Sequence, residues 1–442
     1  MSIRIGFVSL GCAKNLTDTE TMLGLLQADG YEITPEPAEA DVLVVNTCAF
    51  IDAAKEESIG AILDMAAYKE QNCKLLIVTG CLAQRYREQV TEQLPEVDAI
   101  LGVNDYDKIA AVIREFFETH TAQSAVGDAD DTVPEGLPRL RSTPQQYAYL
   151  KIADGCDNHC TYCIIPKLRG HFRSRAPELI LQEARELAAD GVRELILVAQ
   201  DTACYGKDLD GYALPDLLRD LEAVDGIKWI RLQYCYPENI TDALIAEMKR
   251  NKKVVHYLDM PLQHVSDNVL KRMGRKSRQA EIAALLEKLR AALPDLAVRT
   301  SLIVGFPGET EEDFACLAEF LKRAHIDRAG VFPYSQEEGT PAHDFSGQIP
   351  EEMKQARYDT LMQVQQAVSA EWMAKKVGTI IDVMIETYDE SNLCYVGRSY
   401  ADTPDVDGRA YVYSAQELQA GDIGRMRVLE ADEYDVTGEW LA

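Results

Sequence analysis

Six short apolar segments that alternate with helical patterns constrain the fold of the central part of this 442-residue chain. The segments lie at 147–152, 194–199, 229–234, 255–260, 298–304 and 330–334. Helical patterns such as 177–189, 280–293 and 311–323 fill the intervals. Strands that alternate with helices predict a parallel sheet, either an open partial (β/α)6 barrel or a doubly wound sheet. Residues 142–374 are therefore predicted to form one α/β domain, with its reactive residues after the carboxyl ends of the strands.

A similar alternation predicts a smaller α/β domain with a parallel sheet at residues 1–118. Apolar segments at 3–10, 41–46 and 74–79 are separated by helical patterns at 19–27 and 53–68. Each apolar segment runs into a cysteine, and these are Cys12, Cys48 and Cys81. Loops that follow parallel strands emerge on the same edge of the sheet, so the three thiols are expected to converge there. Three cysteines at equivalent turns indicate a metal site rather than core packing.

The remaining segments predict a linker and a third domain. Residues 119–141 are rich in acidic residues, Pro and Gly, which break any periodicity and predict a linker. After a long helical pattern at 351–376, alternating residues separated by turns predict a small β-barrel over 375–442. Its charge is unbalanced, because residues 377–442 contain 14 Asp and Glu against 4 Lys and Arg, a formal charge of −10.

The chemistry of the chain is predicted to centre on a loop that contains Cys156, Cys160 and Cys163, spaced CxxxCxxC. Closely spaced thiolates hold iron-sulfur clusters, usually four of them, but no fourth cysteine follows nearby. A 4Fe-4S cluster on three cysteines keeps one iron open for a substrate. Structural zinc is the alternative, although it normally takes four ligands, commonly as two CxxC pairs, and no second pair is present.

The composition indicates where in the cell this chemistry takes place and which partners it favours. With 47% hydrophobic and 27% charged residues and no apolar run near eighteen residues, we expect a soluble protein. No leader is recognised, so we expect a cytoplasmic location in which the 11 cysteines are reduced. The net charge of −28 disfavours nonspecific nucleic-acid binding and favours basic partners. Five other cysteines are predicted to be ordinary packing residues, namely Cys73, Cys204, Cys235, Cys316 and Cys394.

Residues at the predicted strand ends are further candidates for the site. The strand-end rule selects Gln200 with Asp201, Gln263 with His264, and the turn 305–309. That turn could be taken for a phosphate loop, but the acidic first turn of the following helix would repel a phosphate.

A basic run follows the cysteine loop directly. It comprises Lys167, Arg169, Arg173 and Arg175. The run indicates either a solvated face or an arginine that steadies a bound carboxylate or a cluster. Two nearby histidines, His159 and His171, are expected at the surface or in supporting positions rather than as ligands.

Over nearly its whole length the chain resembles the methylthiotransferase family of radical S-adenosylmethionine (SAM) enzymes. The resemblance rests on the N-terminal cysteine triad, the CxxxCxxC loop with Tyr162, and a C-terminal barrel of the TRAM type. It implies two 4Fe-4S clusters, an auxiliary one on Cys12, Cys48 and Cys81 and one that binds SAM on Cys156, Cys160 and Cys163. We expect four residues at SAM, namely Tyr162, Gln200, Val304 and Gly305, and we assign no catalytic side chain.

The implied reaction uses two SAM molecules. One donates a methyl group to a sulfur associated with the auxiliary cluster. The other yields a 5′-deoxyadenosyl radical that takes hydrogen from an unreactive carbon, and that carbon then gains a methylthio group.

Two segments resemble one branch of that family. They are FVSLGCAKNL at 7–16 and CIIPKLRG at 163–170. The branch modifies the β-carbon of an aspartate in small-subunit ribosomal protein number twelve. That resemblance implies this protein, free or on the ribosome, as partner, together with a reductant such as flavodoxin or ferredoxin, and no membrane.

The acidic barrel agrees with a protein substrate, because an RNA-binding barrel needs cations for phosphates. Nucleic acid is therefore not expected as the direct substrate. Two alternatives stay open, which are methylthiolation of a modified adenosine in tRNA and a noncatalytic iron-sulfur scaffold or electron carrier.

Overall fold

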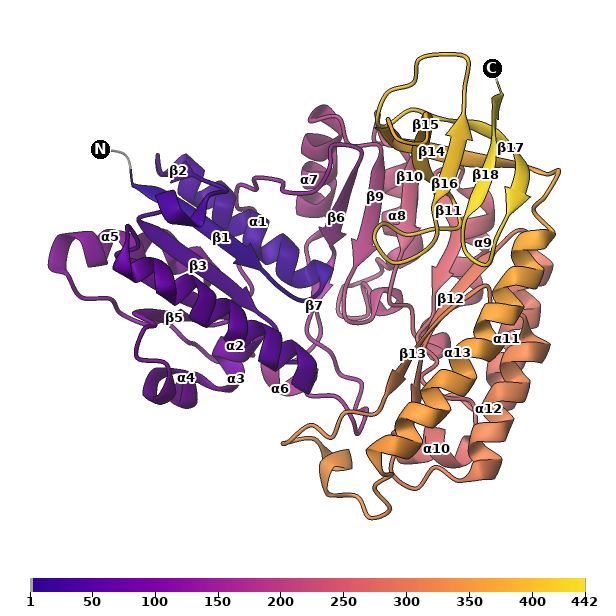
Figure 1. Ribbon diagram of the computed structural model, residues 1–442, viewed down its shortest axis with the longest axis horizontal. Helices are drawn as coiled ribbons and strands as arrows, with labels where there is room; N and C mark the ends of the chain where they lie inside the picture. Colours follow the sequence, from indigo (N-terminus) through magenta and orange to yellow (C-terminus); the bar gives the residue numbers. More distant parts are fainter. Residues whose placement is uncertain (1–2, 442) are drawn as a thin grey trace.

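The computed structural model describes residues 3–441, and the chain forms three parts in sequence order (Figure 1). An N-terminal α/β part lies at one end, a central α/β part follows, and a small β-barrel packs against the central part. This arrangement confirms the predicted fold class. Across residues 3–441 no helix combines the length and the apolar character that a membrane span needs.

The N-terminal part is a five-stranded sheet covered by helices on both faces. Its strands are β1 (Arg4–Ser9), β2 (Glu32–Ile33), β3 (Val42–Thr47), β4 (Leu75–Gly80) and β5 (Ala99–Leu101). They are all parallel, in the order β2-β1-β3-β4-β5. The helices are α1 (Ala13–Ala28), α2 (Asp52–Ala66), α3 (Cys81–Arg85), α4 (Arg87–Gln93) and α5 (Ile109–Thr119). Helices α1 and α5 cover one face and α2 to α4 the other, which explains why β3 and β4 are wholly buried.

The central part is an open six-stranded parallel sheet. Its strands are β6 (Tyr147–Lys151), β9 (Glu194–Val198), β10 (Trp229–Leu232), β11 (Val254–Asp259), β12 (Ala297–Val304) and β13 (Arg328–Pro333). They lie in sequential order, so the partial barrel is correct and the doubly wound alternative, which requires a reversal of order, is wrong. The covering helices are α7 (Pro177–Ala189), α8 (Leu214–Glu222), α9 (Asp242–Arg250), α10 (Asp267–Arg272), α11 (Gln279–Ala292) and α12 (Glu311–Ala324).

Two short strands frame the cysteine loop of the central part. Strand β7 (Ala153–Asp154) pairs antiparallel with β8 (Arg173–Ser174), and the chain between them carries the cysteines and helix α6 (Ile165–Arg169). The loop therefore leaves the sheet after β6 and returns beside its own start. This closure holds the loop at the carboxyl end of the first strand.

The C-terminal part is a closed barrel reached through helix α13 (Glu351–Ala374). Its strands are β14 (Ile380–Asp389), β15 (Cys394–Ser399), β16 (Ala410–Tyr413), β17 (Ile423–Ala431) and β18 (Val436–Leu441). The barrel order is β14-β15-β16-β18-β17. The small barrel predicted from the alternation of residues is thus confirmed, and its closure removes exposed strand edges.

A loop of the barrel packs on the inner face of the central sheet. The Tyr147 hydroxyl donates to Asp405 Oδ2 over 3.2 Å, and the Tyr257 hydroxyl donates to Asp407 Oδ2 over 2.8 Å. The inner face is polar because it carries Glu194, Arg231, Gln233, Asp259 and Arg299. The barrel and the central part are thus joined by buried polar contacts rather than by a flexible tether.

The predicted linker is not a free tether either. Leu101 forms an isolated parallel bridge with Ala125, and Asn104 Nδ2 donates to Ala129 O over 2.9 Å. Arg139 is bonded to Glu20 of α1 and Glu183 of α7. The segment lacks periodicity but follows the surfaces of both α/β parts, which explains its acidic and polar composition.

Candidate active site

The loop of Cys156, Cys160 and Cys163 brings three thiols into one buried region. Gly155 begins it with φ +75°, and a Cβ there would lie 2.0 Å from His171 O, so only glycine fits. Cys156 and Cys160 are each 6% exposed, and Cys163 is half-buried. Burial, together with the neighbouring Cys160 thiol, raises the pKa of Cys156 to about 11. A strong cation such as iron would favour the thiolate form of Cys156.

A buried guanidinium, Arg275, lies beside this triad. Its Nη1 is 3.9 Å from Cys160 Sγ, and its guanidinium carbon is 4.1 Å from the centre of the Tyr236 ring. Arg275 also donates to Pro261 O over 2.9 Å, while its Nε has no partner among the described residues. Its charge offsets that of thiolates. Sequence reasoning missed this residue because it comes from the segment after α10, more than a hundred positions from the loop.

The second cysteine triad forms where β1, β3 and β4 end side by side. A Cβ at Gly11 would be 3.1 Å from Cys48 Sγ, which shows how closely the Cys12 turn approaches Cys48. Burial raises the pKa of Cys81 to about 12, with the Cys12 and Cys48 thiols adding to the shift. The predicted convergence of the three turns is thus observed. Cys81 is buried and the other two thiols are partly so, which suits a metal group sheltered from solvent.

Cys12 differs from its two partners in electrostatic setting. Burial disfavours its thiolate, yet Lys14 and Arg169 together with nearby backbone amides lower the pKa of Cys12 below its usual value. The Lys14 cation also favours the thiolate of Cys163, although burial and the thiol of Cys160 raise the pKa of Cys163 overall. One lysine of the N-terminal part therefore lies near a member of each triad.

Arg169 joins the two triads through side-chain contacts. Its Nη2 donates to Asn15 Oδ1 over 2.6 Å, and Asn15 Oδ1 is 3.9 Å from Cys81 Sγ. Its Nη1 donates to Asp154 Oδ2 over 2.9 Å, and Asp154 Oδ1 accepts from the amide of Gly155. The path thus runs from the N-terminal triad to the residue that precedes Cys156. It fixes the two loops relative to each other.

The basic run after the cysteine loop divides into different roles. Arg169 is buried, so the solvated-face interpretation is wrong for it, and it lies at the N-terminal triad. Arg175 pairs with Glu183 over 2.8 Å, and Arg173 lies 3.7 Å from Asp130. Lys167 is exposed and donates to Gly339 O. The burial of Arg169 depends on the packing of α1 against the central part, which no local pattern reveals.

Two of the four residues expected at SAM, Gln200 and Tyr162, each have a buried oxygen without a hydrogen-bond partner among the described residues. Gln200 Nε2 donates to Asp154 Oδ1 over 2.8 Å, which leaves its Oε1 buried without a partner among the described residues. The Tyr162 hydroxyl is likewise unpartnered and buried, while its ring packs edge-on against Phe306. These two oxygens are available to a bound polar molecule. Tyr162 belongs to the cysteine loop, and Gln200 contacts Asp154 just before it.

Packing and backbone conformation explain why the turn after β12 has a glycine at position 305. Gly305 has φ +72°, and a Cβ there would meet Lys354 Cγ at 2.4 Å, while Val304 is fully buried at the end of β12. The Gly305 amide donates to Glu309 Oε2 over 2.7 Å. The next helix, α12, starts at Glu311, and its N-cap residue Thr310 forms a capping box with Asp313. An acidic helix start of this kind argues against a phosphate site.

Two other residues predicted at strand ends, Asp201 and His264, make hydrogen bonds within the central part. Asp201 Oδ2 accepts from Asn158 Nδ2 of the cysteine loop over 3.0 Å. His264 is fully buried, accepts from the Ser266 amide, and has its pKa lowered to about 3 by burial.

His159 and His171 are exposed, as expected. Of the five cysteines predicted to pack, Cys73, Cys235 and Cys394 are buried, whereas Cys204 and Cys316 are partly exposed.

The donor sets suit clusters rather than a single ion. Within residues 3–441 no three His, Cys, Asp or Glu side chains are arranged to hold one metal ion. A cluster of four irons takes each thiolate on a different iron, so its ligands need not meet at one point. Three sulfur donors in each set, buried or partly buried and close to a guanidinium, fit such a group.

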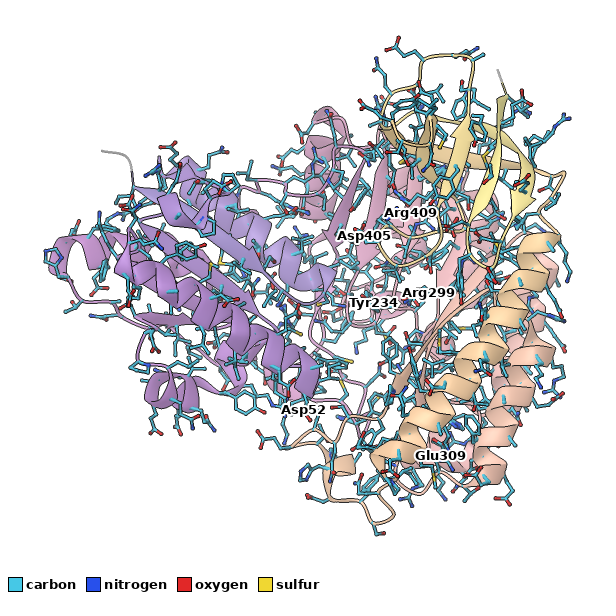
Figure 2. All side chains as sticks on the ribbon, viewed as in Figure 1. Asp52, Tyr234, Arg299, Glu309, Asp405 and Arg409 are labelled. Atoms are coloured by element: carbon cyan, nitrogen blue, oxygen red, sulfur yellow. The ribbon has the colours of Figure 1, made fainter. Side chains whose placement is uncertain are left out.

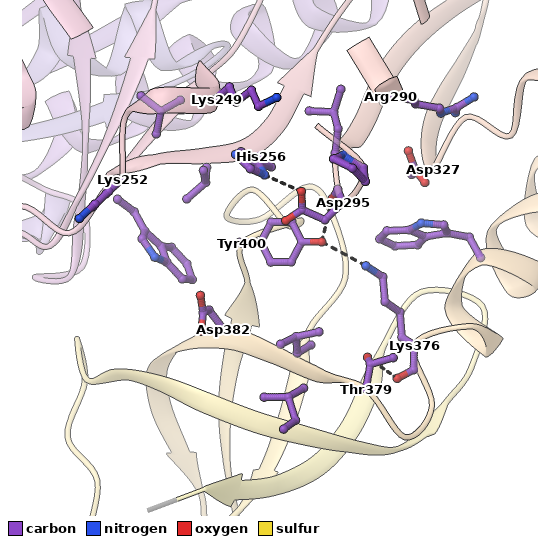
Figure 3. Close-up of a pocket in the computed structure, with 18 of the residues that line it drawn as sticks. Lys249, Lys252, His256, Arg290, Asp295, Asp327, Lys376, Thr379, Asp382 and Tyr400 are labelled. Atoms are coloured by element: carbon purple, nitrogen blue, oxygen red, sulfur yellow. Dashed lines mark hydrogen bonds and ion pairs between the residues drawn. The ribbon is translucent and has the colours of Figure 1, made fainter. Parts of the chain in front are cut away.

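A large cavity lies elsewhere in the structure. It has a volume of about 980 Å³ and lies between the barrel and the amino ends of the central strands. Figure 3 shows Tyr400 at its centre, where the hydroxyl donates to Asp295 O over 2.8 Å and lies 3.2 Å from Lys376 Nζ. Both cysteine triads follow the carboxyl ends of strands instead. This cavity is therefore separate from the cysteine site.

Three family descriptions match successive parts of the chain. Residues 4–102 match "Uncharacterized protein family UPF0004", residues 150–321 match the radical SAM superfamily, and residues 377–441 match the TRAM domain. Among solved structures, a radical SAM methyltransferase, TsrM, from Kitasatospora setae has a TM-score of 0.59 at 13% identity, covering 86% of this chain and 79% of that one. The cobalamin-dependent radical SAM enzyme OxsB has a TM-score of 0.54 at 12% identity, covering 83% and 56%. These two show likeness of fold alone.

Curated relatives match over the full length. The ribosomal protein uS12 methylthiotransferase RimO of Acetivibrio thermocellus is 49% identical over 99% of this chain and 98% of its own. RimO of Geobacter sulfurreducens is 50% identical, covering 99% of both chains, and RimO of Clostridium perfringens is 51% identical over 98% and 97%. Identity at this level and coverage extends through both cysteine triads and the barrel. The chain belongs to the RimO family of ribosomal protein uS12 methylthiotransferases within the radical SAM superfamily.

Proposed function

We propose that this chain adds a methylthio group to the β-carbon of an aspartate in ribosomal protein uS12. The observation that carries the proposal is the joint placement of two cysteine triads at one interface. Each triad belongs to a different part of the chain, and Lys14 and Arg169 lie between them. The names of the relatives support ribosomal protein uS12 as the substrate.

Two 4Fe-4S clusters are part of this proposal. Cys156, Cys160 and Cys163 would hold the cluster that binds SAM, and Cys12, Cys48 and Cys81 would hold the auxiliary one. When bound, these groups supply the electron that cleaves SAM to a 5′-deoxyadenosyl radical and the site at which sulfur is methylated. Membership of the radical SAM superfamily supports the first cluster and SAM, and the converging turns support the second.

The chain's own residues would orient and shield these groups. Arg275 offsets negative charge at Cys160, and Arg169 does so at Cys81. The unpartnered oxygens of Tyr162 and Gln200 would bind polar groups of SAM. Asp154 ties Gln200 to Arg169 and so keeps the SAM side of the site in register with the N-terminal triad.

The proposed partners are uS12, free or on the ribosome, and an external reductant such as flavodoxin or ferredoxin. We place the reaction in the cytoplasm. Acidic side chains on the barrel support a basic protein partner, because opposite charge speeds encounter. Some of the barrel acids serve the fold instead, since Asp402 pairs with Arg328 and Asp407 lies 3.6 Å from Arg299.

The test is a direct assay of product. Protein reconstituted with iron and sulfide, then reduced, is incubated with SAM and either uS12 or unmodified tRNA, and both are analysed by mass spectrometry. We expect a methylthio group on one aspartate of uS12 and none on tRNA. Transfer to tRNA, or 5′-deoxyadenosine without any transfer, would contradict the proposal.

A further inference from the structure

Lys14 lies between the two triads and forms no ion pair with a carboxylate of residues 3–441. Lys14 is 8% exposed, and its Nζ lies 3.6 Å from the centre of the Tyr234 ring. Among residues 3–441 no carboxylate lies within ion-pair distance of this Nζ, and no oxygen accepts from it. On the same interface, Lys151 and Arg169 each bind both Asp18 and Asp154. The Nζ atom is not itself fully enclosed, and its charge acts on the Cys12 and Cys163 thiols, so the ammonium can meet an anion that enters between the triads.

The helix makes the position of Lys14 less favourable still. Lys14 is the second residue of α1, whose amino end carries the positive pole of the helix dipole. Neither burial nor the dipole stabilises an ammonium there. The aromatic face of Tyr234 stabilises it only in part, because an ammonium has three donors. An anion that enters the site would accept from the ammonium donors that the Tyr234 ring does not satisfy.

Tyr234 is held under Lys14 by a strained backbone. Its φ is +60°, a conformation that bulky side chains rarely adopt. Its amide donates to Asp259 Oδ2 over 3.1 Å, and its carbonyl accepts from the Thr202 amide over 2.9 Å, so the residue is fixed from both sides. Asp259 is itself paired with Arg299 over 3.0 Å, and Figure 2 shows Tyr234 and Arg299 close together at the centre of the molecule.

We infer that Lys14, supported by the Tyr234 ring, binds the side-chain carboxylate of the aspartate that is modified. The inference rests on the proposed function and names the residue that recognises the substrate. In an aspartate the carboxylate carbon is bonded directly to the β-carbon, so an anchored carboxylate places the reacting C–H group between the triads. Such orientation lowers the entropic part of the barrier.

The experiment compares two substrates and four enzymes. Reconstituted, reduced wild type, Lys14→Met, Lys14→Arg and Lys322→Met are assayed with uS12 that carries either the target aspartate or asparagine in its place. Met keeps the length of the lysine stem without its charge, and Arg keeps the charge. Lys322 is an exposed lysine on α12, outside the site, and serves as the matched control.

We expect wild type, Lys14→Arg and Lys322→Met to prefer aspartate to asparagine. Lys14→Met should lower kcat/KM for aspartate by roughly 10- to 100-fold, the range for a lost hydrogen bond to a charged group, and should lose the preference. Its iron content should match that of wild type. A lost preference with intact iron would not result from a merely structural role.

Other outcomes would overturn the inference. Lys14→Met that keeps the preference, loses iron, or raises the KM for SAM would assign the lysine to another role. If Lys14→Met does not fold, the wild-type enzyme still tests the inference. Equal use of uS12 with aspartate and uS12 with asparagine would refute carboxylate recognition. If wild type modifies neither form of uS12, the proposed function itself fails.

Discussion

Replacing Arg169 tests the contact between the two cysteine triads. Arg169 is 2% exposed, and its guanidinium binds Asp154 over 2.9 Å and Asp18 over 3.0 Å. Lys151 reaches the same two carboxylates. Two cations therefore balance two buried anions where α1 meets the central part. Arg169→Met keeps most of the side-chain volume and removes one of the two charges.

The expected effect follows from this balance. Removal of one partner of a buried ion pair costs about 3–5 kcal/mol, because the other charge stays buried and uncompensated. Lys151 still binds both carboxylates in the variant, so we expect a value near the lower limit, about 3 kcal/mol. Since each 1.4 kcal/mol is a factor of ten, local opening of this interface should become about 100-fold more frequent.

Hydrogen exchange followed by mass spectrometry measures this opening segment by segment. A chain of several parts does not unfold in two states, so a single melting temperature would not isolate the interface. Metal-free protein should show faster exchange in α1 and β6, with little change in the C-terminal barrel. Arg219→Met is the control, since Arg219 is exposed and its pair with Asp216 contributes less than about 1 kcal/mol. Equal exchange in Arg169→Met and the control would refute the reasoning.

Four further predictions concern the clusters, the barrel and pH. Replacement of Cys156, Cys160 and Cys163 by Ala should leave about half of the iron, because each triad forms its own site, and iron analysis that finds total loss or no loss would contradict this. Replacement of Cys12, Cys48 and Cys81 by Ala should preserve release of 5′-deoxyadenosine but abolish the methylthio product, whereas unchanged product would make this triad structural. Joint reversal to Lys of four exposed barrel acids (Glu390, Glu417, Glu430 and Glu439) should impair modification of uS12 in a salt-dependent way, while single reversals change little. Tight binding of tRNA by the intact protein would oppose that prediction. Burial raises the pKa of Glu309 to about 7 although Arg357 and two amides oppose the shift, so its stabilising contribution is complete below its ordinary value of 4.5 and is lost as pH rises through about 7. The melting temperature of metal-free wild type should thus fall more than that of Glu309→Gln between about pH 6 and 8, and parallel pH curves would be inconsistent with this assignment.

Local sequence patterns predicted most of the architecture. Strands such as β6, β9 and β12 were predicted to within one or two residues, because buried parallel strands are short apolar runs bounded by turns. The cysteine turns were predicted for the same reason, since a residue that directly follows a parallel strand must lie at the carboxyl edge of the sheet. The acidic first turn of the helix after residues 305–309 is also local, and α12 begins with it as predicted.

The linker shows where local patterns stop being informative. Its composition predicted a segment without helix or strand over most of its length, which is what the structure contains. Composition did not predict that Arg139 would be buried between Glu20 and Glu183, because those carboxylates come from helices in two different parts of the chain.

The sequence alone determined where the strands end, the two cysteine triads and the acidic character of the barrel, since these depend on neighbours in the chain. Only the tertiary structure decided that Arg275 lies beside Cys160, that Arg169 is buried, and that Lys14 rests on Tyr234. Each of these contacts joins segments that are far apart in sequence and meet only when the chain packs into its tertiary fold. A lysine in the first turn of a helix beside a cysteine was the one visible sign, because the helix dipole disfavours a cation there. Its partner, a tyrosine strained at a strand end, became apparent only from the backbone conformation that the folded chain imposes.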